Sequence, residues 1–265
     1  MYTSFQLAQK YIRYYLTAAN GKGHGMHSPF VFDFILSVLN NRQGYTPPAQ
    51  IETLRQQLLK NNTEIEIEDL GAGSRKGSTK RRRVAKIAAT AVKPIKWSHF
   101  LYRLVAHYQP KNIIELGTSL GISTAYMSAA NPAATIHTIE GSSAIQQLAT
   151  QNFKALGCTN IHSITGNFDD VLPKVISDVS TSDLAYIDGN HRYAPTMAYF
   201  EQLLSKKSDH SIFIFDDIHW SAEMEKAWEE IKKHPSVTVS IDLFFMGLIF
   251  FRPEVKVSQH YSIRF

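Results

Sequence analysis

Hydrophobic and polar positions follow two different patterns along the chain, and the change comes near residue 110. In the first part, apolar residues such as Leu7, Tyr11 and Tyr14 recur at the three- and four-residue spacing of amphipathic helices. In the second part, short apolar runs typical of buried strands alternate with helical segments. The pattern predicts a helical N-terminal region over residues 1–109 and an α/β domain over residues 110–265.

Residues that break or cap helices set the expected boundaries in the first region. The glycine-rich run 21–25 ends the first helix. Ser28 and Pro29 offer an N-cap and a first-turn proline for the second helix. A third helix is expected within residues 47–60, after two prolines, and Ser98 is expected to cap a fourth.

Seven apolar runs predict the strands of the second region. Helices separate the first five, which implies parallel pairing through right-handed crossovers. These five runs are Asn112–Leu116, Thr135–Ile139, Asn160–Thr165, Asp183–Ile187 and Ser211–Phe215. The last two, Val237–Ile241 and Met246–Arg252, are joined by four residues and can form only an antiparallel hairpin. The expected fold class is therefore a doubly wound α/β sheet of seven strands.

Two glycine-containing turns compete for the role of a cofactor-binding loop, namely Asp69–Ser74 and Glu115–Ser123. A nucleoside-binding half needs a second strand that ends in an acidic residue roughly 20 residues further on, where it can bind ribose hydroxyls. Only the later turn meets this condition, because the strand Thr135–Ile139 leads into Glu140. We therefore place the cofactor at Glu115–Ser123. The turn Asp69–Ser74 is left as a plain turn or as a loop that faces the substrate.

Five short segments of the second region form a series in the order of a known enzyme family. They are Glu115-x-Gly117-x-x-x-Gly121-x-Ser123, Thr138-Ile139-Glu140, Thr165–Pro173, Asp183–Asp188 and Phe215-Asp216-Asp217. Together they resemble the catechol and caffeoyl-CoA O-methyltransferases, a group of class I S-adenosylmethionine-dependent methyltransferases. The Asp-Asp pair is similar to that of the macrocin-type sugar O-methyltransferases. The resemblance covers about residues 110–252. It implies a Rossmann-like methyltransferase domain, S-adenosyl-L-methionine as cofactor and methyl transfer to a small-molecule hydroxyl.

The resemblance also implies a role for each residue of the glycine-containing turn. Glu115 and Ser119 would lie near the methionine and ribose parts of the cofactor, and Ser123 would contact its carboxylate. Gly117 and Gly121 would let the backbone approach the ligand closely. Ser123 has a simpler alternative role as a helix cap.

The remaining cofactor contacts are expected after the neighbouring strands. Glu140 would accept the ribose hydroxyls, and Phe168 and Asp169 would flank the adenine. Asp188 would border the same site. Phe168 could instead belong to the core, and Asp169 could be a solvated acid in the first turn of a helix.

Three aspartates follow the fourth and fifth expected strands, at the strand ends where open α/β sheets bind ligands. Asp188 follows the fourth strand, and Asp216 and Asp217 follow the fifth. Neighbouring carboxylates repel one another unless a cation joins them, and oxygen ligands suit Mg²⁺, Ca²⁺ or Mn²⁺. The sequence thus predicts a divalent-metal site at these three residues. In the simpler alternative, Asp188 lines the cofactor pocket and Asp217 caps the next helix.

His191 lies three residues after Asp188, where the resemblance implies a general-base lysine. An imidazole can remove a proton near pH 7 without a large pKa shift. We therefore predict His191 and Asp188 as catalytic residues. His219 and Trp220, shortly after the last aspartate, are expected to shape the acceptor pocket.

Composition limits the remaining choices. The hydrophobic fraction of 44% and the charged fraction of 19% are ordinary for a globular protein. The longest apolar runs are far too short to cross a bilayer. The single cysteine, Cys158, excludes an intrachain disulfide and a cysteine zinc cluster. Without a secretory signal at Met1–Phe5, these features favour a cytoplasmic protein with no membrane partner. A homo-oligomer is left open.

The formal charge of +5 is concentrated in a basic cluster at residues 75–83, made of Arg75, Lys76, Lys80, Arg81, Arg82 and Arg83. Such a run is usually a solvated face and otherwise an anion site. An RNA or other nucleic-acid methyltransferase is therefore one alternative. A NAD-dependent oxidoreductase is another, although Gly117 and Gly121 lack the G-x-G-x-x-G spacing. A third is a non-catalytic module with the same fold. The identity of the methyl acceptor is not encoded in any of these motifs.

Overall fold

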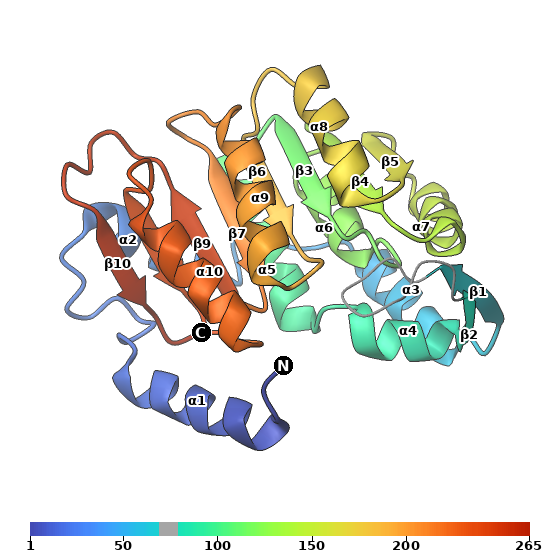
Figure 1. Ribbon diagram of the computed structural model, residues 1–265, viewed down its shortest axis with the longest axis horizontal. Coiled ribbons are helices and arrows are strands. Elements are labelled where there is room, and N and C mark those ends of the chain that lie inside the picture. The colour runs from blue at the N-terminus through green and yellow to red at the C-terminus, as the bar shows by residue number, and fades with distance from the viewer. Residues whose placement is uncertain (69–78) are drawn as a thin grey trace. The chain divides into compact units, whose positions relative to one another are not determined.

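The computed structural model describes residues 1–68 and 79–265 (Figure 1). The turn Asp69–Ser74 and the basic residues Arg75 and Lys76 lie outside the described residues. The chain forms two compact units. The first combines Met1–Asn40 with Ile176–Phe265, and the second is Asn41–Val175.

Three parallel strands form the sheet of the second unit. Their bounds are β3 (Asn112–Leu116), β4 (Thr135–Glu140) and β5 (Ile161–Thr165), with β4 between the other two. The helices after them are α6 (Ile122–Ala130), α7 (Ser143–Ala155) and α8 (Phe168–Asp178). This alternation confirms the first three expected strands and their parallel pairing.

The N-terminal part of the second unit is helical with one added strand pair. Its elements are α3 (Ala49–Lys60), β1 (Glu64–Glu68), β2 (Thr79–Arg83), α4 (Val84–Ala91) and α5 (Ile95–Tyr108). The expectation that Ser98 caps a helix is wrong. The helix α5 begins at Ile95, after Pro94, and Ser98 is fully buried within it. Because a proline is compatible with the start of a helix, α5 extends one turn further than the serine suggested.

The described part of the basic cluster belongs to an ion-paired hairpin. Strands β1 and β2 are antiparallel, with Glu66 opposite Arg81 and Glu64 opposite Arg83. The Nε atoms of the two arginines lie 3.1 and 3.5 Å from the carboxylates, and all four side chains are exposed. Cross-strand pairs of this kind are worth at most about 1 kcal/mol. The arrangement fits the interpretation of this run as a solvated face.

The first unit contains the remaining five strands, β6 (Leu184–Ile187), β7 (Ile212–Asp216), β8 (Val239–Asp242), β9 (Met246–Phe250) and β10 (Gln259–Ser262). Strands β6 and β7 are parallel, and β9 lies antiparallel between β7 and β8. The expected C-terminal hairpin is thus confirmed. Strand β10 pairs parallel to β8 and is an addition to the expected order.

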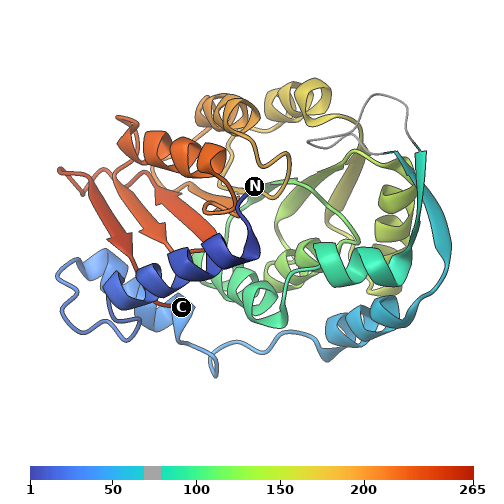
Figure 2. The ribbon, with the colours of Figure 1, turned by 60° about the horizontal axis from the view of Figure 1, so that its bottom comes forward.

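Helices cover both faces of the strands in the first unit (Figure 2). On one face, Phe215 of β7 packs against Phe200 of α9 (Tyr193–Leu204) and Trp228 of α10 (Ala222–Lys233). On the other face, Phe250 of β9 packs against Phe30 and Phe34. These two rings come from α2 (Pro29–Asp33) and the π-helical segment η1 (Phe34–Leu39). Coverage of both faces confirms the doubly wound α/β class and explains why β6, β7 and β9 are buried along their whole length. Within residues 1–68 and 79–265, each helix is too short or too polar to cross a bilayer.

The N-terminal helix α1 (Ser4–Thr17) docks through an aromatic cluster. A capping box between Thr3 and Gln6 starts the helix. Tyr11 and Tyr14 then pack against Phe244, with ring centroids 5.0 and 5.3 Å apart. One face of α1 is therefore fixed to the turn between β8 and β9.

A charged network fastens the start of the chain to α10. The Glu225 carboxylate accepts from the Tyr2 hydroxyl at 2.7 Å and from the Lys10 ammonium at 3.0 Å. It also lies 2.9 Å from Nδ1 of His219, whose Nε2 lies 2.9 Å from Asp242. Burial opposes protonation of His219, but its bonds to Asp242 and Glu225 outweigh burial and raise its pKa. Burial likewise opposes ionisation of Glu225, yet its donors Tyr2, His219 and Lys10 lower the pKa.

We predict that Glu225→Ala lowers the free energy of unfolding by about 2–3 kcal/mol, because three donors lose their shared acceptor. The matched control is Glu229→Ala, one turn further along α10. Glu229 is 55% exposed and pairs only with Lys232 in the described contacts, so its removal is expected to cost less than about 1 kcal/mol. Urea denaturation of both variants measures the difference. Equal losses would show that the network contributes no more than a surface ion pair.

Candidate functional site

The turn after β3 adopts the left-handed backbone that close approach to a ligand requires. Gly117 has φ 104°, Ser119 has φ 47° and Gly121 has φ 79°. The amide of Gly117 donates to the carbonyl of Ile139 at 3.0 Å, which ties the turn to β4. A Cβ at Gly121 would stand 2.4 Å from the ring of Phe153. Both the positive φ and the lack of space therefore require glycine at this position.

Glu115 anchors the turn from inside the unit. It is the last residue but one of β3 and is fully buried, and its carboxylate accepts from Thr138 of β4 at 2.6 Å and from Thr124 of α6. A fully buried carboxylate needs donors of this kind to compensate for lost hydration. Glu115 thus joins the strand before the turn, the helix after it and the neighbouring strand.

Glu140 links the same turn to the end of β4. One carboxylate oxygen accepts from the amide of Ser119 at 2.9 Å, and the other accepts from the amide of Ser142 at 3.0 Å. A carboxylate offers about four acceptor positions, so these two bonds do not by themselves use all the acceptor positions of the half-buried Glu140.

The residues expected around the rest of the cofactor follow the same strand ends. Ser123 is half-buried in the first turn of α6, whose N-terminus is capped by Gly121 without a side-chain hydrogen bond. Free amides at such a helix start attract anionic groups. The amide of Gly166 donates to the Glu140 carbonyl at 2.9 Å, which brings the segment after β5 beside the end of β4. Phe168 begins α8 half-buried, and Asp169 is exposed next to it.

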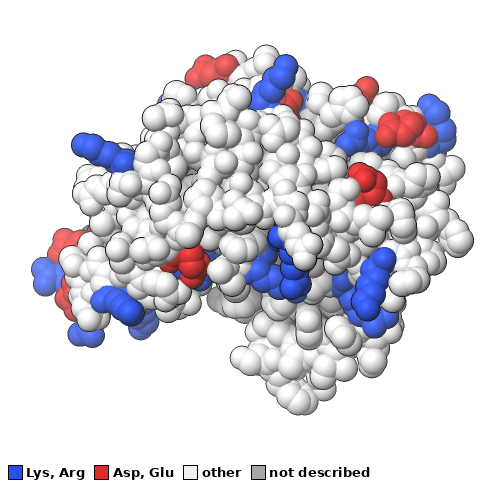
Figure 3. All heavy atoms as spheres, turned by 180° about the vertical axis from the view of Figure 1, so that it is seen from behind, with Lys and Arg blue, Asp and Glu red and all other residues white. Residues whose placement is uncertain are grey.

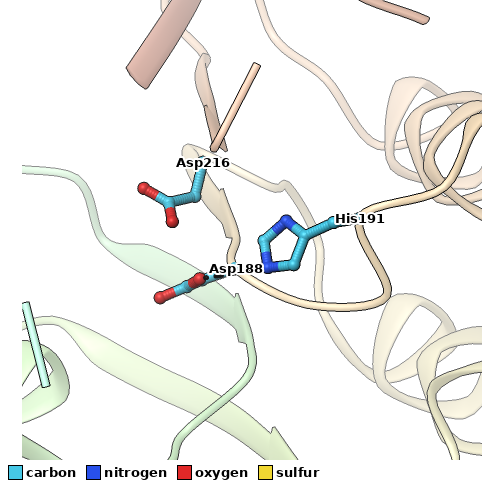
Figure 4. Close-up of side chains that lie close together, drawn as sticks. All are labelled: Asp188, His191 and Asp216. Carbon is cyan, nitrogen blue, oxygen red and sulfur yellow. Dashed lines mark ion pairs between the residues drawn. The ribbon is translucent and has the colours of Figure 1, made fainter. Parts of the chain in front are cut away.

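A second cluster forms within the other unit at the ends of β6 and β7 (Figure 4). Ligand atoms of Asp188, His191 and Asp216 all lie within 4.8 Å of one another. His191 Nε2 is 3.7 Å from Asp188 Oδ1, and the Tyr186 hydroxyl donates to Asp188 Oδ2 at 3.1 Å. Asp216 is only 2% exposed. Two carboxylates and one imidazole so close together offer a ligand set for a divalent cation.

The turn that follows Asp188 brings His191 into this cluster. Asn190 has φ 61°, and its side chain donates to the Tyr199 hydroxyl at 3.0 Å and accepts from Arg192 at 3.2 Å. These bonds hold a left-handed turn that asparagine tolerates. The sequence predicts His191 as a base and not as a metal ligand, whereas the structure places it in the same cluster as Asp188 and Asp216. The Asp-x-x-His spacing is the sequence feature that could have indicated this position.

Asp217 stands apart from the three clustered residues. It has φ 54°, and its amide donates to the carbonyl of Phe245 at 2.7 Å. The group within mutual ligand distance contains Asp216 but not Asp217. A ligand role for Asp217 stays a prediction. Its backbone bond holds the loop after β7 against the turn between β8 and β9.

Comparison with known proteins finds methyltransferases among the proteins that this chain resembles. A family model described as a methyltransferase domain matches residues 114–218. A catechol O-methyltransferase of Niastella koreensis is 30% identical over 122 residues, which are 45% of this chain and 54% of that protein. The chain thus matches about half the length of this curated relative. The resemblance to methyltransferases drawn from the sequence is confirmed.

Solved structures with the same fold match a larger share of this chain than the curated relative does. An O-methyltransferase from Bacillus cereus, in complex with S-adenosylhomocysteine, has a TM-score of 0.58 and 18% identity. The match covers 81% of this chain and 96% of that one. A methyltransferase from Podospora anserina, also bound to S-adenosylhomocysteine, has a TM-score of 0.56 and 15% identity over 78% and 97% of the two chains. At these identities the likeness establishes the methyltransferase fold.

We predict that the protein binds Mn²⁺ and that Asp188→Asn or Asp216→Asn weakens this binding at least about tenfold, because each removes a charged ligand. Asp209→Asn is the matched control, since it removes the same charge from an exposed position of the same unit. Electron paramagnetic resonance of free Mn²⁺ measures the affinity, and thermal stabilisation by the metal supplies a second reading. Asp217→Asn tests directly whether the neighbouring carboxylate is a ligand. Equal affinities of all four variants and the parent would remove the metal from this cluster.

Proposed function

We propose that this chain is an S-adenosylmethionine-dependent methyltransferase that methylates a hydroxyl of a small molecule. The observation that carries the proposal is the position of Glu140, whose carboxylate lies at the end of β4 and binds the amide of Ser119 in the glycine-containing turn. This pairing of an acidic strand end with such a turn is suited to the ribose of a nucleoside. The methyltransferase-domain model matches the same stretch of chain.

The cofactor site is proposed to lie on the second unit. Glu140 would accept the ribose hydroxyls, and the free amides at the start of α6, with Ser123, would bind the methionine carboxylate. Gly117, Ser119 and Gly121 shape the turn that brings the backbone close. Glu115 supports this turn through its bonds to Thr124 and Thr138. Phe168 and Asp169 would border the adenine.

Methyl transfer needs an acceptor oxygen that has lost its proton. S-adenosylmethionine, when bound, would supply the methyl group from its sulfonium and would leave as S-adenosylhomocysteine. His191 is proposed to take the hydroxyl proton, because it lies beside Asp188 on a turn fixed by Asn190. A divalent cation at the aspartates would supply positive charge that makes the hydroxyl more acidic.

The alternative functions are not favoured. Nicotinamide binding would call for the G-x-G-x-x-G spacing, which the turn at Gly117 and Gly121 lacks. For nucleic-acid binding, Arg81 and Arg83 would have to leave their carboxylate partners on β1. Lys and Arg side chains are also interspersed with acidic ones on the face shown in Figure 3. A small phenol, catechol or sugar therefore remains the proposed acceptor class. The proposed compartment is the cytoplasm.

We predict that Glu140→Ala weakens binding of S-adenosylhomocysteine by roughly 2–4 kcal/mol, since a charged acceptor of two hydroxyls is lost. Glu140→Gln keeps one acceptor oxygen and is expected to lose less. Asp170→Ala is the control, because it removes an exposed acid at the start of α8. Titration calorimetry on variants with unchanged melting temperature measures the effect. Unchanged affinity in Glu140→Ala would move the cofactor away from this turn and end the proposed function.

We predict that His191→Ala lowers turnover about 10²–10⁴-fold, because the acceptor proton loses its base. Production of S-adenosylhomocysteine from a panel of phenols, catechols and sugars provides the assay. His191→Lys should restore part of the activity and move the rising limb of the pH–rate profile to higher pH, since lysine titrates higher. His210→Ala, at an exposed position, is the control.

The two roles open to His191 give different results. If it is a base, His191→Ala loses turnover but keeps its Mn²⁺ affinity. If it is a metal ligand, affinity and turnover fall together. Retention of more than about a third of the activity would contradict both roles and leave the metal alone to acidify the hydroxyl.

A further inference from the structure

The outer face of α1 is an exposed apolar stripe. Phe5 is 71% exposed, Ile12 57%, Tyr15 51% and Leu16 75%. Phe5, Ile12 and Leu16 are spaced by seven and four residues, which places them on one side of a helix. Tyr11 and Tyr14 lie on the opposite side, against Phe244. The helix is therefore apolar on two faces and buries only one of them.

The exposed apolar area of the stripe is larger than that of single, scattered apolar residues on a protein surface. A large side chain exposes about 200 Å² when free, so the four residues together expose roughly 500 Å². Single exposed apolar residues are normal, but a continuous patch of several hundred Å² marks an interaction surface. Tyr15 widens the stripe along one flank.

The charges on and near α1 are too few to attract an anionic partner strongly. The chain has no Asp or Glu before Asp33, and its cations up to that point are Lys10, Arg13 and Lys22. Lys10 is already paired with Glu225. On the one face that Figure 3 shows, the projection at the bottom, which corresponds to α1 in Figure 1, carries few charged side chains. An anionic membrane attracts about 1 kcal/mol per cation, so one or two cations would hold α1 there only weakly.

The stripe is complementary to itself. If two copies of α1 cross antiparallel about a two-fold axis, Phe5 of each copy meets Leu16 of the other, and both Ile12 side chains lie near the axis. Such an isologous contact uses the same patch twice. Two stripes of this size bury roughly 1,000 Å² in total, which is at the lower limit for a specific interface.

We propose that the outer face of α1, formed by Phe5, Ile12, Tyr15 and Leu16, joins two copies of this chain into a dimer. The inference is independent of the proposed methyltransferase function. Because the buried area is small, the dimer forms and dissociates with concentration. Each copy keeps the inner face of α1 on its own Phe244, so no exchange of elements is needed.

Sedimentation equilibrium of the full chain over a series of concentrations tests the proposal. The parent is expected to approach twice the monomer mass of 29.9 kDa. Ile12→Glu and Leu16→Glu should each raise the dimer dissociation constant at least tenfold, because a charge enters the apolar contact. Thr17→Glu is the matched control, since it adds the same charge to an exposed position off the stripe and should leave the dimer intact.

Three outcomes would overturn the proposal. A parent that stays monomeric throughout has no such dimer. A dimer that persists in Ile12→Glu and Leu16→Glu is formed by another surface. Binding of the parent to vesicles of anionic lipid, lost in Ile12→Glu, would assign the stripe to a membrane surface instead. Unchanged melting temperatures of the variants exclude unfolding as the cause of a lost dimer.

Discussion

A carboxylate that leaves water needs hydrogen-bond donors, and this requirement shapes the most important loops of the protein. Glu115 meets it with two threonines from neighbouring elements. Glu140 meets it with two backbone amides, one of them in the glycine-containing turn. Glu225 meets it with side chains from the start of the chain and from His219. In each case, satisfying one charge fixes the position of a segment distant in sequence.

The same principle distinguishes the two clusters of candidate residues, each within its own unit. In the second unit, the carboxylates of Glu115 and Glu140 accept hydrogen bonds that hold the turn to its neighbouring elements. In the first unit, Asp188 and Asp216 lie close to each other and to His191. Two negative charges at this distance favour a bound cation or a shared proton.

Both clusters contain a residue whose backbone is in the left-handed conformation. Ser119 and Asn190 have positive φ without being glycine, and each lies in a turn held by a side-chain hydrogen bond. Asp217 and Phe244 share this conformation in two loops joined by the bond from the Asp217 amide to Phe245. Because α1 packs on Phe244, the start of the chain supports the loop that follows the buried Asp216.

The sequence by itself determined the order of strands and helices after residue 110, the parallel and hairpin pairings, the turn at Glu115–Ser123 and its acidic partner Glu140. Local apolar runs report burial directly, and the distance from one strand end to the next is set by the length of a crossover. Only the tertiary structure decided that β1 and β2 form an ion-paired hairpin, that Ser98 is buried and that β10 joins the sheet. It also decided that His191, rather than Asp217, lies in one cluster with Asp188 and Asp216. It also decided the network from Tyr2 to Asp242. These features depend on contacts between residues that are distant in sequence. Hydrophobic periodicity is a local signal and does not specify such contacts.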